Sequence, residues 1–353
     1  MLSSAKGGEE SGEGQLGPEQ PPSDGNCKGG EGASAPQRLL SPSPHREFPT
    51  LESEMMNLEL LYHFTTVTYK TLSTDDTVRE VWRLVIPRIA FSFSFVMHAL
   101  LAFSALHLNF LRSPGKSYAV IAAAHHGKAV MSLKTASGEL PPQHADALFA
   151  ATCLTAMYVF TCPPVLENIL RAPSWIPLFV GVTATAQRCW AWLQNGELAP
   201  LMVRKKADPQ RLPAESVEFP SSLFDLSLRG ASGELDPQEL EDDFVLEVYR
   251  DATKALKESW DLFWLTEPRI SGGFRWAPTM PEKFPSFIKE QRPRALVLLA
   301  YHCAMMESVE EQYWWIRGVG LDEIKRIEAV LDEKWKRWLD WPMAKCKISK
   351  GNI

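Results

Sequence analysis

Histidine side chains are the first candidates for chemistry in this sequence, because imidazole serves both as a metal ligand and as an acid–base group. His125 and His126 are adjacent, and adjacent side chains of a helix point about 100° apart, so both rings cannot easily bind one metal ion. His98 and His107 lie nine positions apart, which places them roughly on opposite sides of one helix. We therefore predict no metal site, and we interpret His125 and His126 as one buried residue and one surface residue.

Serine nucleophiles are the second candidates. A Ser-x-x-Lys string occurs at 113–116 and again at 286–289. That motif belongs on a helix with supporting motifs elsewhere, which are not evident in this chain. The sequence also contains no His-Glu-x-x-His zinc motif and no Gly-rich phosphate loop. Paired acids such as Asp75–Asp76 fit helix starts, where they favour the positive end of the helix dipole. We predict that the chain is not an enzyme and has no cofactor.

Aromatic side chains crowd the last third of the chain, from Trp260 to Trp341. On helices such residues are most often simple core. The alternative is a large apolar pocket for a flat lipid, which a polar group such as His98 or His302 would orient. Periodicity alone does not separate the two interpretations. The candidate pocket residues on apolar helices are Met97, Leu101, Phe103, Met157, Phe160, Tyr301 and Met305.

Composition, charge and cysteine content narrow the class of protein. The 353 residues are 45% hydrophobic and 23% charged, which is ordinary for a globular protein, and the formal net charge is −6. A module that binds DNA or an anionic membrane by itself is usually basic. The six cysteines are scattered and form no Cys-x-x-Cys pair. We expect reduced thiols in a cytosolic or nuclear protein.

The spacing of apolar residues predicts an all-α fold, an irregular multi-helix bundle of about nine helices. Residues 1–50 are rich in Gly, Pro, Ser and Glu, and we expect a disordered polar tail there. A single helical domain is expected over 55–342, with a loop-rich excursion at about 200–236 where prolines and glycines gather. The expected helices cover about 55–72, 78–85, 93–111, 117–134, 145–161, 177–195, 236–265, 293–316 and 321–339.

One segment has the length of a membrane span. No charged residue occurs from Ile89 to Leu111, and such a length would cross a bilayer. The segment nevertheless contains several Ser, His and Asn residues, and the helix after it is again amphipathic. We predict the central helix of a soluble bundle and no membrane span.

Four strings resemble, in the same order, segments of one family of fungal regulators. They read LELLYHFTT (58–66), MHALLAFSALHL (97–108), PRALVLLAY (293–301) and YWWIRG (313–318). The chain is therefore identified as similar to the C-terminal regulatory domain of fungal zinc-cluster transcription factors, in particular those related to the sterol uptake control protein. The strings and a final Trp-Pro at 341–342 extend over nearly all of the helical part.

This resemblance implies an all-helical regulatory domain, joined in family members to a six-cysteine zinc cluster that binds DNA. In the sterol-sensing branch the domain is understood to bind a sterol in an apolar pocket and thereby control nuclear entry. The family's ligand-responsive Trp-Trp-x-x-Gly region maps to Trp314, Trp315 and Gly318. Before the helical domain this sequence contains only Cys27, so we expect no direct DNA binding by this chain.

Three hypotheses follow from the resemblance and from the residues. The first is a nuclear regulatory domain, shuttling with the cytoplasm, that responds to a sterol or other apolar ligand, to a protein partner, or to a second copy. The second is a helical scaffold or dimer partner of full-length zinc-cluster factors that senses nothing. The third is an enzyme acting on a hydrophobic metabolite, for which the sequence shows no constellation of residues.

Overall fold

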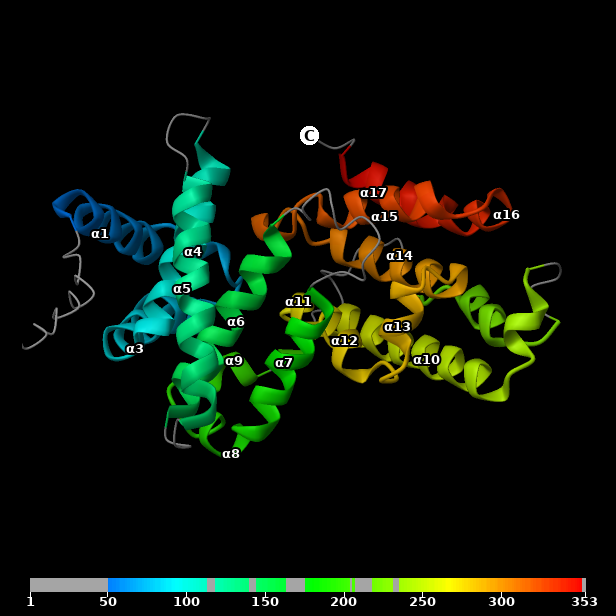
Figure 1. Cartoon of the computed structure of the whole chain (residues 1–353), viewed down its shortest axis with the longest axis horizontal. Helices are drawn as coiled ribbons and strands as arrows, with labels where there is room; N and C mark the ends of the chain where they lie inside the picture. Colours follow the sequence, from blue (N-terminus) through cyan, green and yellow to red (C-terminus); the bar gives the residue numbers. More distant parts are fainter. Residues whose placement is uncertain are drawn as a thin grey trace, which may run out of the picture. The chain divides into compact units, whose positions relative to one another are not determined.

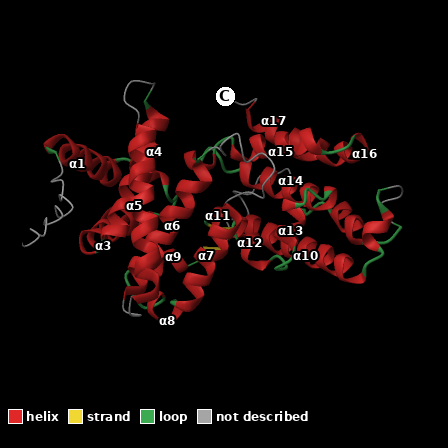
Figure 2. Ribbon diagram, in the orientation of Figure 1, coloured by secondary structure: helices red, strands yellow, loops and turns green. Residues whose placement is uncertain are grey.

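The fold is built from helices. The computed structural model describes residues 50–112, 118–139, 144–162, 175–203, 205–206, 218–230 and 235–350. Within these ranges the chain is helical almost throughout, which confirms the all-α class (Figure 2). A short antiparallel pair joins β1 (Lys205–Lys206) to β2 (Thr266–Glu267). The predicted tail over 1–50 lies outside the described residues apart from Thr50, and the domain bounds 55–342 stay a prediction.

The first helices pack around α4 (Ser94–Leu111), which contacts α1, α3, α5 and α6 (Figure 1). This helix is long and apolar enough to cross a membrane by composition, yet 61% of its residues are buried against its neighbours. That burial is typical of a core helix. The other elements of this part are α1 (Leu51–Thr66), η1 (Thr68–Thr71), α2 (Asp76–Glu80), a π-helical turn (Val81–Val85), α3 (Ile86–Ser92), α5 (Tyr118–Glu139) and α6 (Ala145–Thr161).

The helix expected over 78–85 does not stop at residue 85, because the chain stays helical through Pro87. The π-helical turn Val81–Val85 follows α2 directly, and α3 continues from Ile86 with Pro87 in its first turn. Proline is tolerated there because the first turn has no intrahelical partner for its missing N–H. The wider π turn brings the chain to that point without a break.

The remaining helices surround α10 (Asp243–Leu265) and α14 (Pro293–Glu307), which contact each other. All but the first residue of α14 are buried. The elements along this part are α7 (Trp175–Arg188), α8 (Trp190–Leu193), α9 (Ala199–Met202), η6 (Ser221–Ser227), η7 (Pro237–Leu240), α11 (Arg269–Gly273), α12 (Trp276–Thr279), α13 (Phe284–Lys289), η8 (Trp314–Ile316), α15 (Val319–Val330), α16 (Glu333–Lys336), η9 (Arg337–Leu339) and α17 (Asp340–Lys350).

Several expected helices are shorter or divided, so the described residues contain more than nine. The helix expected over 177–195 is divided at Cys189, and the one expected over 293–316 ends at Glu307. Short helices also form at 269–279 in a Pro/Gly-rich stretch that the sequence suggested was a break. In the excursion expected at 200–236, much of the chain lies outside the described residues, and η6 packs on α10.

The start of α10 also differs from expectation. The helix expected over 236–265 does not begin at Asp236, whose φ is 37° and whose side chain caps nothing. The cap is Asp242, whose Oδ1 accepts a hydrogen bond of 2.9 Å from the backbone N–H of Phe244. Both aspartates precede an apolar run, so local sequence could not distinguish them.

A buried ion pair ties η7 to α14. Arg294 is fully buried, and its guanidinium pairs with Glu239 and donates to the backbone carbonyl of Leu235. The hydroxyl of Tyr249 on α10 donates to the same carboxylate at 2.5 Å. A buried charge is tolerated only when it is paired and hydrogen-bonded, so this cluster holds η7 against both helices.

The close approach of α11 to α10 yields a stability prediction. A Cβ added at Gly272 would lie 2.4 Å from the backbone nitrogen of Phe263, whereas one added at Gly127 in α5 would meet nothing within 4 Å. Gly272→Ala should therefore lower the free energy of unfolding by about 1–3 kcal/mol or more. Gly127→Ala, the matched control, should raise it by up to about 1 kcal/mol through helix propensity. Urea unfolding followed by circular dichroism measures the free energy of unfolding of both variants. Equal stability of the two variants would contradict the close approach of α11 to α10.

Candidate functional site

The residues predicted to bind an apolar ligand lie on α4, α6, α14 and η8. Most are buried: Leu101 is 3% exposed and Met305 1%. They do not form one group. Phe160 and Trp315 come together, with ring centroids 6.0 Å apart, whereas the others contact different neighbours. The predicted set is Met97, His98, Leu101, Met157, Phe160, Tyr301, Met305, Trp314, Trp315 and Gly318.

Trp314 extends from η8 onto the first helices. Its indole N–H donates to the hydroxyl of Thr71 at 3.0 Å, although the two residues are 243 positions apart. Its ring stacks on the imidazole of His107, with centroids 4.7 Å apart and planes tilted by 19°. Phe103 and Phe110 of α4 lie on the same indole, each with its ring centroid at 5.3 Å. One side chain therefore fixes the C-terminal segment to η1 and α4.

Trp315 belongs to a different aromatic cluster. Its indole stacks on Phe274, directly after α11, at 5.8 Å and 13°. Phe274 in turn stacks on Phe179 of α7 at 3.7 Å, and Phe160 of α6 meets both phenyl rings edge-on. We call Phe160, Phe179, Phe274 and Trp315 the aromatic cluster. Its rings lie between α6, α7, α11 and η8, so these elements meet through flat apolar surfaces.

Two other predicted residues, Tyr301 and His98, have partners outside the aromatic cluster. Tyr301 stacks on Trp341 of α17, with centroids 5.1 Å apart and planes 2° from parallel. Nδ1 of His98 lies 3.0 Å from Nδ1 of His125 on α5. The neighbouring His126 stacks on Tyr158 of α6, with ring centroids 3.9 Å apart. The first contact joins α14 to α17, and the two histidine contacts join α5 to α4 and to α6.

A second histidine pair lies under Trp314. Nδ1 of His107 is 2.8 Å from the hydroxyl of Thr68 and 3.3 Å from Nε2 of His63. Burial first, and the neighbouring His63 second, lower the pKa of His107 to about 4. The pKa of His63 is lowered as well, by burial first and by Arg112 second. Neutral imidazoles can share one hydrogen bond, whereas two imidazolium ions at this distance would repel.

Gly318 follows the tryptophans and begins α15. Its φ of 76° is left-handed, a region that suits glycine. The carboxylate of Glu310 accepts the N–H of Gly318 at 3.0 Å, and that of Glu307 accepts the N–H of Gly320 at 3.1 Å. Both carboxylates are buried. They bind the unpaired N–H groups at the start of α15 and hold the end of the Trp314–Trp315 segment in place.

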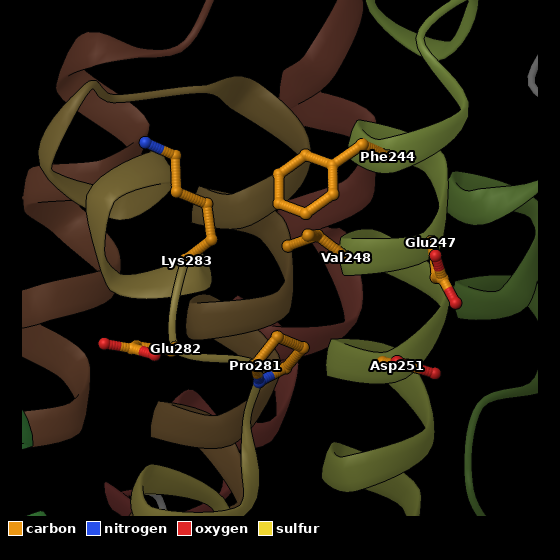
Figure 3. A pocket seen from close by; sticks show the side chains of 7 residues that line it. All are labelled: Phe244, Glu247, Val248, Asp251, Pro281, Glu282 and Lys283. Atoms are coloured by element: carbon orange, nitrogen blue, oxygen red, sulfur yellow. The ribbon is translucent and has the colours of Figure 1, made fainter.

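A surface groove of about 500 Å³ lies away from all these residues, between α10 and the segment 281–283. Figure 3 shows the side chains of Phe244 and Val248 extending from α10 toward the segment that carries Lys283. Glu247, Asp251, Pro281 and Glu282 complete its lining. None of the predicted ligand residues lines this groove. Across the described ranges, no three His, Cys, Asp or Glu side chains gather closely enough to hold a metal ion.

Comparison with known proteins shows similarity to fungal transcription factors. The Fungal specific transcription factor domain matches residues 59–169, the part that runs from within α1 past the end of α6. The chain is related to the fungal zinc-cluster transcription factors. A Zn(2)-C6 fungal-type transcription factor of Gibberella zeae is 26% identical over 324 residues, covering 85% of this chain and 63% of the relative.

Two further relatives match this chain. The Zn(2)-C6 fungal-type transcription factor afumD of Aspergillus fumigatus is 27% identical over 289 residues, 77% of this chain and 74% of its own length. Sterol uptake control protein 2 of Saccharomyces cerevisiae is 33% identical over 104 residues, only 29% of this chain and 11% of that protein. The chain thus spans about two thirds of the first relative and a small part of the sterol regulator.

Sequence reasoning missed the partners of the two tryptophans. His63 and Thr71 were not singled out, and His107 was considered only as a metal ligand. Polar residues at 104 and 107 in an otherwise apolar helix were the available signal, because a buried polar group requires a partner. Ser104 indeed donates to the backbone carbonyl of Leu60 on α1 at 2.6 Å.

The contact between Trp314 and Thr71 should be measurable as an interaction energy. Thr71→Val and Trp314→Phe each remove one partner of this hydrogen bond, so a double-mutant cycle should give a coupling of about 1 kcal/mol in unfolding free energy. Trp315→Phe is the matched control, because Trp315 contacts the aromatic cluster instead. Its effect should add to that of Thr71→Val within about 0.5 kcal/mol. Additivity in both cycles would mean that the hydrogen bond does not form in solution.

His107 predicts a loss of stability in acid. Unfolded, its imidazole takes up a proton near pH 6.5, but folded only near pH 4. Between these values the unfolded state binds more protons, so lowering the pH lowers the free energy of unfolding, by up to about 3 kcal/mol at about 1.4 kcal/mol per pKa unit. His107→Asn should be less stable at pH 7 but should depend less steeply on pH in this window. Urea unfolding across the pH series measures both slopes, and parallel slopes would contradict the assignment.

Proposed function

We propose that this chain is a transcription-regulatory domain whose state changes when an apolar ligand of the sterol class binds near the aromatic cluster. The observation that carries the proposal is the double attachment of Trp314 and Trp315. These neighbours connect the C-terminal segment to η1 and α4 on one side and to α6, α7 and Phe274 on the other. A change at either tryptophan therefore reaches both groups of helices.

The ligand would act by displacing a ring. In the described structure the space between α6, α7 and α11 is filled by the aromatic cluster, so an apolar molecule has to take the place of at least one of its rings. A ligand shifts an equilibrium only by its difference in affinity for the two states. A flat apolar molecule meets this requirement, because it would bind only where the rings have separated. The sterol class is supported by the similarity to sterol uptake control protein 2.

The regulatory role would be carried out in the nucleus, with shuttling from the cytoplasm as part of the response. We propose that this domain acts through the ligand or a protein partner rather than through its own DNA contacts. The net charge of −6 supports this, because binding to DNA phosphates relies on an excess of Lys and Arg. The alternative is a helical scaffold or dimer partner of zinc-cluster factors, which large exposed apolar side chains on α1 would support.

Sterol titration tests the proposal. A sterol should bind the purified full-length chain saturably and raise its melting temperature, because a ligand that prefers the folded state stabilises it. Trp315→Leu should weaken binding at least about tenfold, equivalent to about 1.4 kcal/mol. Native mass spectrometry and a fluorescent-sterol titration give stoichiometry and affinity.

Phe244→Ala is the control for this titration, because Phe244 is 57% exposed in the surface groove, away from the aromatic cluster. That variant should bind as the wild type does. If Phe244→Ala alone lost binding, the ligand would occupy the groove and the proposal would be wrong. A folded chain that ignores sterols but associates with itself or with a zinc-cluster factor would favour the scaffold.

A further inference from the structure

Helix α1 has two apolar faces, and only one of them is covered. Leu60 and Phe64 are fully buried, and α1 contacts α4. Four large apolar side chains on the same helix are instead exposed to solvent, each by more than half of its surface. They are Leu51 (73%), Met55 (58%), Leu58 (59%) and Tyr62 (70%). We call these four residues the α1 stripe.

The α1 stripe is one continuous face. Its residues are separated by four, three and four positions. At about 100° per residue they fall within a sector of about 60°, on the side of the helix opposite Leu60. Single exposed apolar residues are ordinary on protein surfaces, but a contiguous set marks an interaction site. The alternating spacing of three and four is that of a helix that packs along another helix.

Carboxylates flank this stripe on both sides. By the same geometry Glu52 and Glu59 lie along one edge and Glu54 along the other. No Lys or Arg occurs in α1 (Leu51–Thr66), and Glu59 is within 3.3 Å of Arg112 from α4. In a pairing of two copies through this stripe, acidic edges would meet acidic edges and repel. A partner with basic edges would meet opposite charge.

We propose that the α1 stripe is the docking face for an amphipathic helix of a partner protein, with Leu-type residues at spacings of three and four flanked by Lys or Arg. The inference deepens the partner side of the proposed function and rests on it for its regulatory meaning. The contact itself depends on α1 alone, because the stripe lies on the face of α1 that points away from α4 and hence from Trp314. If no sterol bound to the chain, the proposal of this docking face would stand. If no helix bound to the α1 stripe, the proposal of a sterol site would stand.

Two designed helical peptides test the proposal with the full-length chain. Both carry leucines at alternating spacings of three and four, one with lysines beside them and the other with glutamates. Fluorescence anisotropy at moderate salt should show saturable binding of the lysine peptide and at least about tenfold weaker binding of the glutamate peptide. Leu58→Asp should weaken binding of the lysine peptide at least about tenfold, with unchanged circular dichroism. Glu52→Lys combined with Glu54→Lys should reverse the preference between the peptides.

Leu84→Asp is the matched control, because Leu84 has the same side chain and the same exposure, 59%, as Leu58 but lies on the π-helical turn. It should bind the lysine peptide as the wild type does. Equal loss of lysine-peptide binding in Leu84→Asp and Leu58→Asp would show that the peptide is attracted to the chain unspecifically, and it would overturn the proposal. So would a dimer in sedimentation that Leu58→Asp dissolves, because a second copy would then cover the stripe. Binding that appears only after removal of residues 1–48 would assign the stripe to the chain's own N-terminal segment and would also overturn it.

Discussion

The stacking of the Trp314 indole on the His107 imidazole holds two distant parts of the chain in register. Burial keeps this imidazole neutral, and the hydroxyl of Thr71 accepts the indole N–H. The C-terminal segment contributes the indole, and the N-terminal helices contribute the ring on which it stacks and the hydrogen-bond acceptor. If the C-terminal segment moved away at this point, the indole N–H of Trp314 would lose its acceptor.

Neutrality is a wider feature of the α4 surroundings. His63, His98, His107, His125 and His126 all have lowered pKa values, in each case chiefly through burial. His63 pairs with His107, and His98 pairs with His125. Each of these four imidazoles thereby has a polar neighbour without a net charge. Between η7 and α14 the buried group is instead a charged one. Arg294 is buried there and forms an ion pair with Glu239. The histidine pairs lose stability as the pH falls from about 6.5 toward about 4, whereas the ion pair depends on keeping both partners.

The long helices could be predicted from the sequence, and their side-chain partners could not. Apolar spacing predicted α6 at its observed bounds, and the Ser, His and Asn residues within the uncharged run indicated a core helix at α4, because these signals are local. The choice between Asp236 and Asp242 as a cap, the π turn before Pro87 and the short helices at 269–279 depend on tertiary packing. Of the residues predicted to bind a ligand, Phe160 and Trp315 contact each other, whereas Tyr301 stacks on Trp341. The sequence does not show such partners, because a ring on a buried helix face stacks on whichever neighbour the fold supplies.

The carboxylates of Glu310 and Glu307 hold the backbone at the end of the Trp314–Trp315 segment, whereas the ring contacts hold its side chains. The hydrogen bond from the N–H of Gly318 to Glu310 closes the base of a loop, and the bond from Gly320 to Glu307 fixes that base to the end of α14. Neither hydrogen bond involves an indole. A loop that is closed at its base has fewer conformations to lose when its rings pack, so these two carboxylates lower the entropic cost of placing Trp314 and Trp315.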